Sequence, residues 1–131
     1  MRTGRLSGKA RLLVKPFTVK SHEHSAEANI ALAAALRLGR GWEFLRVAFL
    51  HFDAFRVDAL PLWAVEAGLD RERFLSAQAE AREIVVNVKK EGLRIGVEAT
   101  PTLFLNGRRY AGDLDVDAIV DCVEEEAEVA R

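Results

Sequence analysis

An Asn-Gly dipeptide at positions 106–107, directly after the apolar run Thr102–Leu105, constrains the fold more than any other part of the sequence. Both residue types tolerate positive φ, so the pair is a strong signal for a two-residue β-hairpin. It predicts strands at Thr102–Leu105 and Arg108–Tyr110. Gly112 then breaks the second strand, and Asp115 can cap a final amphipathic helix over Val116–Val129. The end of the chain must therefore combine a small sheet with a covering helix.

The preceding hundred residues are predicted to be mainly helical. A short apolar run with β-branched and aromatic members predicts one strand, which Pro16 interrupts or ends. Ser25, Gly39, Asp58, Gly68 and Asp70 mark the starts and ends of helices in the rest of this region. The predicted elements are a strand at Ala10–Val19, helices at Ala26–Leu38, Trp42–Phe52 and Ala59–Ala67, and a helical stretch from Asp70 to Leu93 that could contain a break.

Composition excludes several classes of protein. A chain of 131 residues has the length of one domain. Its 19 basic and 20 acidic residues give a net charge of −1, which argues against a nucleic-acid partner. No apolar run reaches the roughly 18–20 residues of a membrane span, so no membrane partner is expected. The single cysteine, Cys122, can form neither an internal disulfide nor a CxxC motif.

The segment from Gly96 to Gly107, with the sequence GVEATPTLFLNG and followed by Tyr110 and Gly112, resembles the C-terminal half of the DsbA-like thioredoxin family. Three upstream features also resemble this family. They are the Ser21-His22 pair after a strand that ends near Pro16-Phe17, the Ala-rich helix, and the segment Gly39–Phe44. The resemblance implies an α/β, thioredoxin-like fold: one domain over residues 1–131 whose small sheet carries an inserted helical bundle at about 22–95. The cis-proline loop, hairpin and last helix then occupy about 96–129.

The same resemblance determines the expected function. Family members carry a first strand and a CxxC motif ahead of the strand that corresponds to Ala10–Val19, so the chain is expected to be N-terminally truncated relative to them. It is interpreted as a domain of the thiol–disulfide oxidoreductase or disulfide isomerase family that is redox-inactive without that motif, which leaves its status as an enzyme undecided. Thr100 and Pro101, joined by a cis bond, would contact the substrate. No catalytic residue, metal or cofactor is expected.

Two alternatives remain open from the residues. The chain could be a redox-silent module that binds a polypeptide or a protein partner through Thr100 and Pro101. It could also bind a metal through His22, His24 and His51, although these histidines equally suit a solvated loop and a helix start. Cys122 is interpreted as a small half-buried residue on a helix flank, with an intermolecular disulfide or a regulatory thiol as the alternative. The aromatic side chains, Trp42, Phe44, Phe49, Phe52, Phe55, Trp63 and Phe74, are predicted to form the core of the helical bundle.

In the DsbA-like family the first strand lies in the sheet between the strand that corresponds to Leu12–Val14 and the strand after Pro101, so the resemblance implies that this chain lacks a central strand. Backbone groups along the strand at Leu12–Val14 and along the strand after Pro101 would lack partners, and each unmet buried group costs about 1–3 kcal/mol. The sequence therefore predicts a homodimer whose interface includes Leu12–Val14 or the first nine residues. The sequence carries no export signal, which makes the cytoplasm the default compartment, whereas the family is often exported.

Overall fold

A computed structural model describes residues 8–19 and 24–129 of the chain. Its internal contacts divide the chain into two compact units. The larger, helical unit is Lys15–Thr100, and the smaller unit consists of Met1–Val14 together with Pro101–Arg131. The single domain expected from the sequence stays a prediction.

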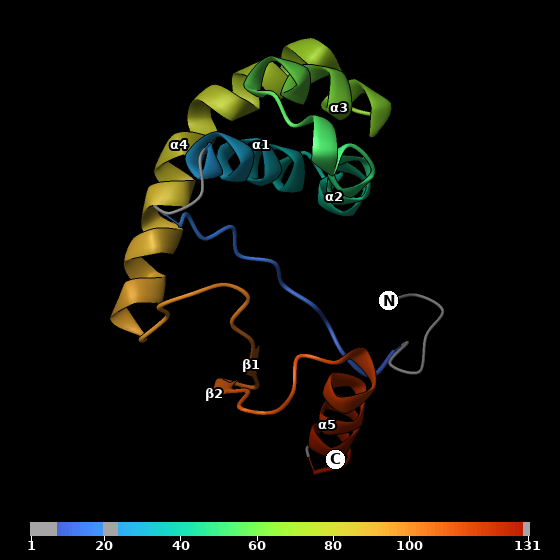
Figure 1. Ribbon diagram of the computed structural model, residues 1–131, viewed down its shortest axis with the longest axis vertical. Helices are drawn as coiled ribbons and strands as arrows, with labels where there is room; N and C mark the ends of the chain where they lie inside the picture. The colour runs from blue at the N-terminus through green and yellow to red at the C-terminus, as the bar shows by residue number, and fades with distance from the viewer. Residues whose placement is uncertain (1–7, 20–23, 130–131) are drawn as a thin grey trace. The chain divides into compact units, whose positions relative to one another are not determined.

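The helical unit contains four α-helices and two short 3₁₀ turns (Figure 1). Helix α1 lies beside α4 and also contacts α2 and α3. The elements in chain order are α1 (Ser25–Arg37), α2 (Gly41–Leu50), the 3₁₀ turns η1 (Phe52–Ala54) and η2 (Val57–Ala59), α3 (Leu60–Glu66) and α4 (Arg71–Arg94). No helix among the described residues is both long and apolar enough to cross a bilayer.

The core of this unit is built around α1, in which six consecutive residues from Ile30 to Ala35 are buried. Four of the six are alanines, whose small side chains allow neighbouring helices to approach α1 from several sides. Phe74 of α4 is fully buried and stacks on Phe44 of α2, with 6.0 Å between the ring centroids. The predicted Ala-rich helix is therefore the centre of the bundle rather than one of its surfaces.

Several predicted helix boundaries are confirmed. The predicted Gly39 and Gly68 follow α1 and α3 with positive φ, as C-terminal glycines do, and Gly96, which was not predicted, follows α4 in the same way. The Asp70 carboxylate accepts a hydrogen bond of 3.0 Å from the backbone N–H of Arg73, so Asp70 caps α4. Helix α4 then runs for 24 residues without the break that the sequence left open.

Two predicted N-caps are wrong because their side chains bind elsewhere. The Ser25 hydroxyl accepts a hydrogen bond of 3.0 Å from the backbone N–H of Val19, and the helix begins at Ser25 itself with His24 in the N-cap position. Asp58 forms an ion pair of 2.6 Å with Arg56 instead of capping α3. In both cases a nearby donor competes for the same short polar side chain.

The smaller unit contains the predicted hairpin and the last helix. Strands β1 (Phe104–Leu105) and β2 (Arg108–Arg109) pair antiparallel, with Phe104 opposite Arg109 and Leu105 opposite Arg108. Both turn residues between them have positive φ, 49° and 84°, as the Asn-Gly pair predicted. Helix α5 (Val116–Val129) has the predicted bounds, and the Asp115 carboxylate accepts from the backbone N–H of Ala118 at 3.2 Å. A thioredoxin-like α/β class is compatible with this small sheet and its helices.

The predicted strand at Ala10–Val19 is wrong for the described residues 10–19, none of which is in a strand. Its polar groups use other partners: the Val19 N–H donates to Ser25, and the Thr18 carbonyl accepts a hydrogen bond of 2.6 Å from Lys89 Nζ. A strand needs a neighbouring strand to pair with, and the sheet among the described residues consists of β1 and β2. The apolar pattern identified a segment that contacts α4, but not its conformation.

The aromatic core prediction is correct for part of the set. Phe44, Trp63 and Phe74 are buried, and Phe55 is half-buried. The other three aromatic residues lie at the surface, with exposed fractions of 48% for Trp42, 73% for Phe49 and 72% for Phe52.

Candidate functional site

The candidate site begins where α4 ends. Gly96 has a φ of 89° and donates its N–H to the Leu93 carbonyl, while the Val97 N–H donates to the Gly92 carbonyl at 2.8 Å. These two bonds form a Schellman motif, which ends the helix and reverses the chain. Val97 is buried, so the motif anchors the start of the loop to the helical unit.

The predicted substrate-binding residues, Thr100 and Pro101, lie in the exposed bend after this motif. Thr100 is the last residue of the helical unit and Pro101 the first of the second segment of the smaller unit. Both side chains are open to solvent, as a contact point for a ligand requires. The cis geometry expected from the resemblance stays a prediction.

Strand β1 follows this bend and has one edge directed away from β2. In a two-residue hairpin the residues next to the turn, here Leu105 and Arg108, form the hydrogen-bonded pair. Phe104 and Arg109 are then the non-hydrogen-bonded pair, so the backbone N–H and C=O of Phe104 point outward. The hydrogen bond of 2.9 Å from the Tyr110 N–H to the Leu103 carbonyl fits this alternation. β1 therefore presents Phe104 as an outward donor and acceptor three residues after Pro101.

Tyr110 closes the other end of the hairpin. Its hydroxyl donates to the Asp113 carbonyl at 2.5 Å, and its ring covers Gly112, where a Cβ atom would lie 2.6 Å from the phenol oxygen. The pKa of Tyr110 is raised, first by desolvation and then by the nearby Cys122, Asp113 and Asp115. Tyr110 therefore remains a neutral phenol that holds the loop after β2, and a structural role suffices for it.

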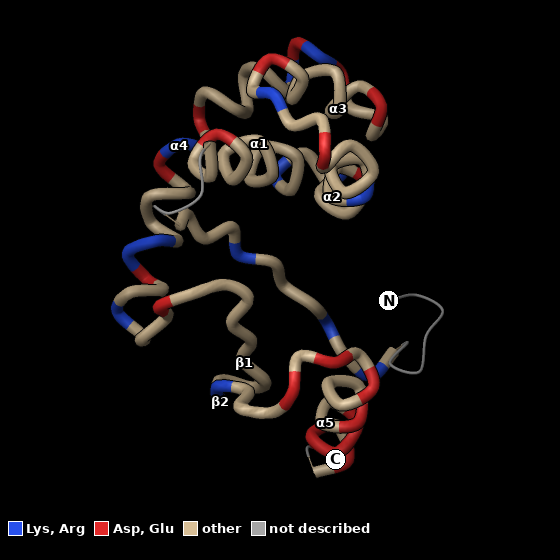
Figure 2. The backbone as a smooth tube through the Cα atoms, viewed as in Figure 1, with Lys and Arg blue, Asp and Glu red and all other residues tan. Residues whose placement is uncertain are grey.

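Cys122, as predicted, is half-buried in the interior of a helix, six positions after α5 begins. A reactive thiolate is commonly stabilised by a helix N-terminus or an adjacent cation, and Cys122 is not at a helix N-terminus. Figure 2 shows that the charged residues of α5 itself are acidic. The position of Cys122 in the helix interior, away from the helix N-terminus, therefore gives no structural support for a redox role.

The two described histidines, His24 and His51, take part in an aromatic stack within the helical unit. His51 Nε2 lies 2.9 Å from Glu66 Oε2, and the His51 ring stacks on Trp63 with 5.8 Å between centroids. Phe55 contacts Trp63 edge-on and stacks on His24, so the stack reaches the N-terminal end of α1. These contacts explain His24 and His51 as packing residues.

The proposed metal site has no support from this arrangement. Among residues 8–19 and 24–129, no group of three or more His, Cys, Asp and Glu side chains is placed to hold a metal ion. His22, the third proposed ligand, lies outside the described residues.

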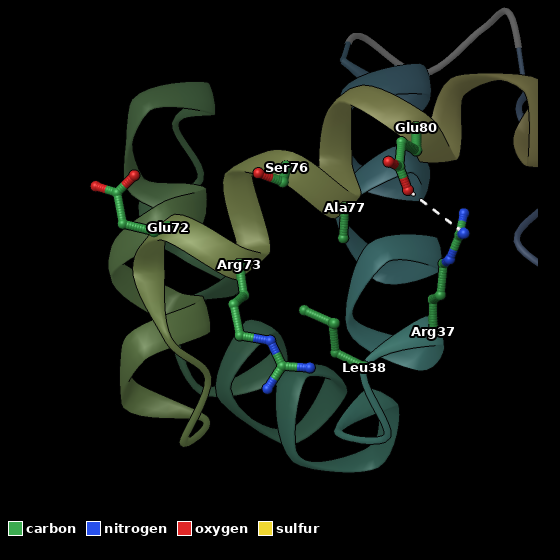
Figure 3. A pocket seen from close by; sticks show the side chains of 7 residues that line it. All are labelled: Arg37, Leu38, Glu72, Arg73, Ser76, Ala77 and Glu80. Carbon is green, nitrogen blue, oxygen red and sulfur yellow. Dashed lines mark ion pairs between the residues drawn. The ribbon is translucent and has the colours of Figure 1, made fainter.

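An open depression of about 320 Å³ lies between the C-terminal end of α1 and the first turns of α4 (Figure 3). Its floor is apolar, and an ion pair of 3.4 Å between Arg37 and Glu80 lies at one side. The lining residues are Arg37, Leu38, Glu72, Arg73, Ser76, Ala77 and Glu80. Two arginines and two glutamates balance, so the depression has no net charge that would select a ligand, and no residue predicted for the site lines it.

The sequence matches a known family over nearly its whole length. The family model described as thioredoxin covers residues 4–125. The chain therefore belongs to the thioredoxin family. The resemblance inferred from the Thr-Pro-Thr and Asn-Gly segment is confirmed at this level. No solved structure gives a significant match.

The similar curated proteins are much longer than this chain. A Na(+)/H(+) antiporter NhaA of Herminiimonas arsenicoxydans is 32% identical over 106 residues, which are 79% of this chain and 17% of the relative. NhaA 3 of Salinispora tropica is 33% identical over 101 residues, 75% of this chain and 15% of the relative. NhaA 1 of Mycolicibacterium gilvum is 29% identical over 109 residues, 80% and 18% respectively. The chain thus spans less than one fifth of the length of these relatives.

Sequence reasoning predicted a substrate contact at Thr100 and Pro101, which stays a prediction, and it missed the outward backbone edge at Phe104. The missing step was to extend the hairpin register by one residue, since the Asn-Gly turn determines which backbone groups point outward. It also missed Lys89, which binds the Thr18 carbonyl across 71 positions of sequence. No local pattern signals a contact of that separation.

Proposed function

We propose that the chain is a DsbA-like thioredoxin module that binds an extended polypeptide segment at the Thr100-Pro101 bend and along β1. The observation that carries the proposal is the outward-facing backbone of Phe104, shortly after an exposed bend in a chain of the thioredoxin family. An extended peptide can add to such an edge as a further strand. Main-chain hydrogen bonds would supply the affinity, and the bend would limit where the peptide begins.

The proposal includes no thiol chemistry by this chain alone. Dithiol–disulfide exchange requires two cysteines that alternate between thiols and a disulfide, and the sequence holds one. That cysteine lies in a helix interior. Binding is therefore the function proposed for these 131 residues, with thiol–disulfide exchange as the chemistry of the wider DsbA-like group.

Backbone pairing at Phe104 can be tested by removing one donor. Phe104→Pro deletes the outward N–H, while the bonds between β1 and β2, which involve Leu105 and Leu103, remain possible. Fluorescence anisotropy with labelled extended peptides should show a loss of binding for Phe104→Pro. Phe104→Ala keeps the amide and serves as the matched control. Equal binding by both variants would contradict pairing at this edge, and circular dichroism checks that both variants are folded.

The names of the similar proteins suggest one source for the bound polypeptide. Eight of the similar proteins are called Na(+)/H(+) antiporters, and this chain matches a minor part of their length. The polypeptide bound could accordingly be a segment of such a transporter. A detergent-solubilised antiporter of this type, immobilised and exposed to the chain, should retain wild-type protein and release Phe104→Pro. Equal retention of the wild-type chain and of Phe104→Pro would show that the antiporter does not bind at the β1 edge.

A further inference from the structure

Helix α2 is apolar on two opposite faces. Its buried face consists of Gly41, Phe44 and Val47. On the opposite face, Trp42 and Phe49 are aligned along the helix through Leu45, which is spaced three and four residues from them and is half-buried. A helix that is hydrophobic all round is normally buried. Yet Trp42 is 48% exposed and Phe49 is 73% exposed. The second face of α2 therefore has the composition of an interface without a partner among the described residues.

The exposed surface continues past the end of the helix. Phe52, in the turn after α2, is 72% exposed and lies three residues after Phe49. We call Trp42, Leu45, Phe49 and Phe52 the α2 stripe. With about 150–250 Å² for a whole aromatic side chain, the three aromatic rings expose roughly 400 Å². An apolar patch of this size is often functional, although a stable complex buries about 800 Å² on each partner.

A positive charge lies beside the stripe. Arg46 lies four residues after Trp42 and three before Phe49, so it is on the same side of the helix. It is exposed and has no ion pair with any residue in the described part of the chain. The nearest acidic residue of α2, Glu43, is at 4.0 Å from Arg40. Arg46 is thus available to a carboxylate on whatever covers the stripe.

The position of Arg46 argues against a second copy of this chain as the occupant. In a symmetric contact, residues near the two-fold axis meet their own copies. Trp42 and Phe49 are both largely exposed, and the midpoint between them falls at positions 45 and 46. A two-fold contact centred on the stripe would therefore bring two arginines together. A bilayer surface is a weaker fit too, because stable anchoring uses a polybasic patch and the stripe has one unpaired arginine.

We propose that the α2 stripe binds an amphipathic helix of another protein, with apolar residues on one face and a carboxylate that pairs with Arg46. The stripe belongs to the helical unit, whereas β1 belongs to the smaller unit. Because the apolar area of the stripe is small, the complex should be reversible. A hydrophobic contact has no preferred direction, so the positive charge of Arg46 would select among apolar helices.

Trp42 lies within the stripe and reports directly on its occupation. The probe is a synthetic helical peptide with leucines on one face and glutamates along its edge, and the matched peptide carries lysines instead of glutamates. The glutamate peptide should shift the Trp42 emission to shorter wavelength and protect it from acrylamide, while the buried Trp63 contributes a constant background. Phe49→Ser should weaken binding about tenfold or more, which corresponds to at least about 1.4 kcal/mol. Leu114→Ser removes a leucine that is 62% exposed in the other unit and should change nothing.

The charge requirement is tested by reversal. Arg46→Glu should bind the lysine peptide better than the glutamate peptide, opposite to the wild type. An unchanged preference would overturn the pairing with Arg46. The proposal also fails if neither peptide protects Trp42, if neutral or anionic lipid vesicles protect it instead, or if sedimentation shows that Phe49→Ser abolishes self-association of the chain.

Discussion

Lys89 connects residues 17 and 18 to helix α4, and its replacement tests how that segment is held. Its Nζ donates to the Thr18 carbonyl at 2.6 Å and lies 4.0 Å from the centroid of the Phe17 ring. Gly92, one turn further along the helix, leaves room for the ring, because a Cβ there would lie 2.6 Å from a Phe17 ring carbon. The segment that was predicted to be a strand is instead held by side-chain contacts.

Lys89→Met removes the donor and the cation but keeps a long apolar side chain. A hydrogen bond to a charged group contributes about 1.5–3 kcal/mol, and a cation–π contact at a partly exposed site about 0.5–1 kcal/mol. Thr18 also loses the partner of a part-buried carbonyl. We expect the free energy of unfolding to fall by about 2–3 kcal/mol. The lower end of this range applies because the Lys89 side chain is partly exposed and solvent weakens its interactions.

Urea unfolding followed by circular dichroism at 222 nm measures this loss. With a slope of about 1–3 kcal/mol per molar urea, the midpoint should fall by about 1 M. Lys90→Met, at an exposed neighbouring position, is the matched control and should change the free energy of unfolding by less than about 0.5 kcal/mol. Equal midpoints for the two variants would refute the assignment of Lys89 as the anchor. A double-mutant cycle with Phe17→Leu then separates the ring contact from the hydrogen bond.

Three further outcomes are expected. Asp70→Ala should lower the free energy of unfolding by about 1 kcal/mol through loss of the cap, whereas Asp58→Ala, which caps no helix, should be near neutral in urea titrations. The purified chain should not accelerate insulin reduction, and the Cys122→Ser variant should give the same rate as the wild type. A reduction activity of the wild type that the variant lacks would contradict the proposal that the chain only binds. Sedimentation should show a dimer that Leu13→Asp dissociates, since Leu13 is 64% exposed; a monomer at every concentration would contradict it.

The turns and helix ends were largely predictable because they depend on local chemistry. An Asn-Gly pair adopts positive φ in any context that allows a hairpin, and 106 and 107 do so here. Asp70 and Asp115 cap the helices that follow them, since the acceptor and the backbone donor are three residues apart. Such interactions need no information from the rest of the chain.

The failed strand prediction has a different cause. The segment 10–19 has strand composition, but a strand depends on a partner that can lie anywhere in the sequence. Here its polar groups bind Ser25 and Lys89, so its conformation depends on residues that the local pattern does not include. The same dependence limited the site: Thr100 and Pro101 follow from the resemblance of their own segment and stay a prediction, whereas the outward edge of Phe104 required the register of both strands.

The exposed aromatic residues show where periodicity stops being informative. Trp42 and Phe49 were both predicted to lie in the core, but α2 is apolar on two faces and only one of them is covered within the described helical unit. The β1 edge and the α2 stripe lie in different units, so their proposed ligands can be separated by two variants. Phe104→Pro should abolish binding of extended peptides and leave the helical peptide unaffected, and Phe49→Ser should do the reverse. Loss of both activities in either variant would indicate that the two peptides bind by a shared non-specific mechanism, because neither substitution removes a buried residue.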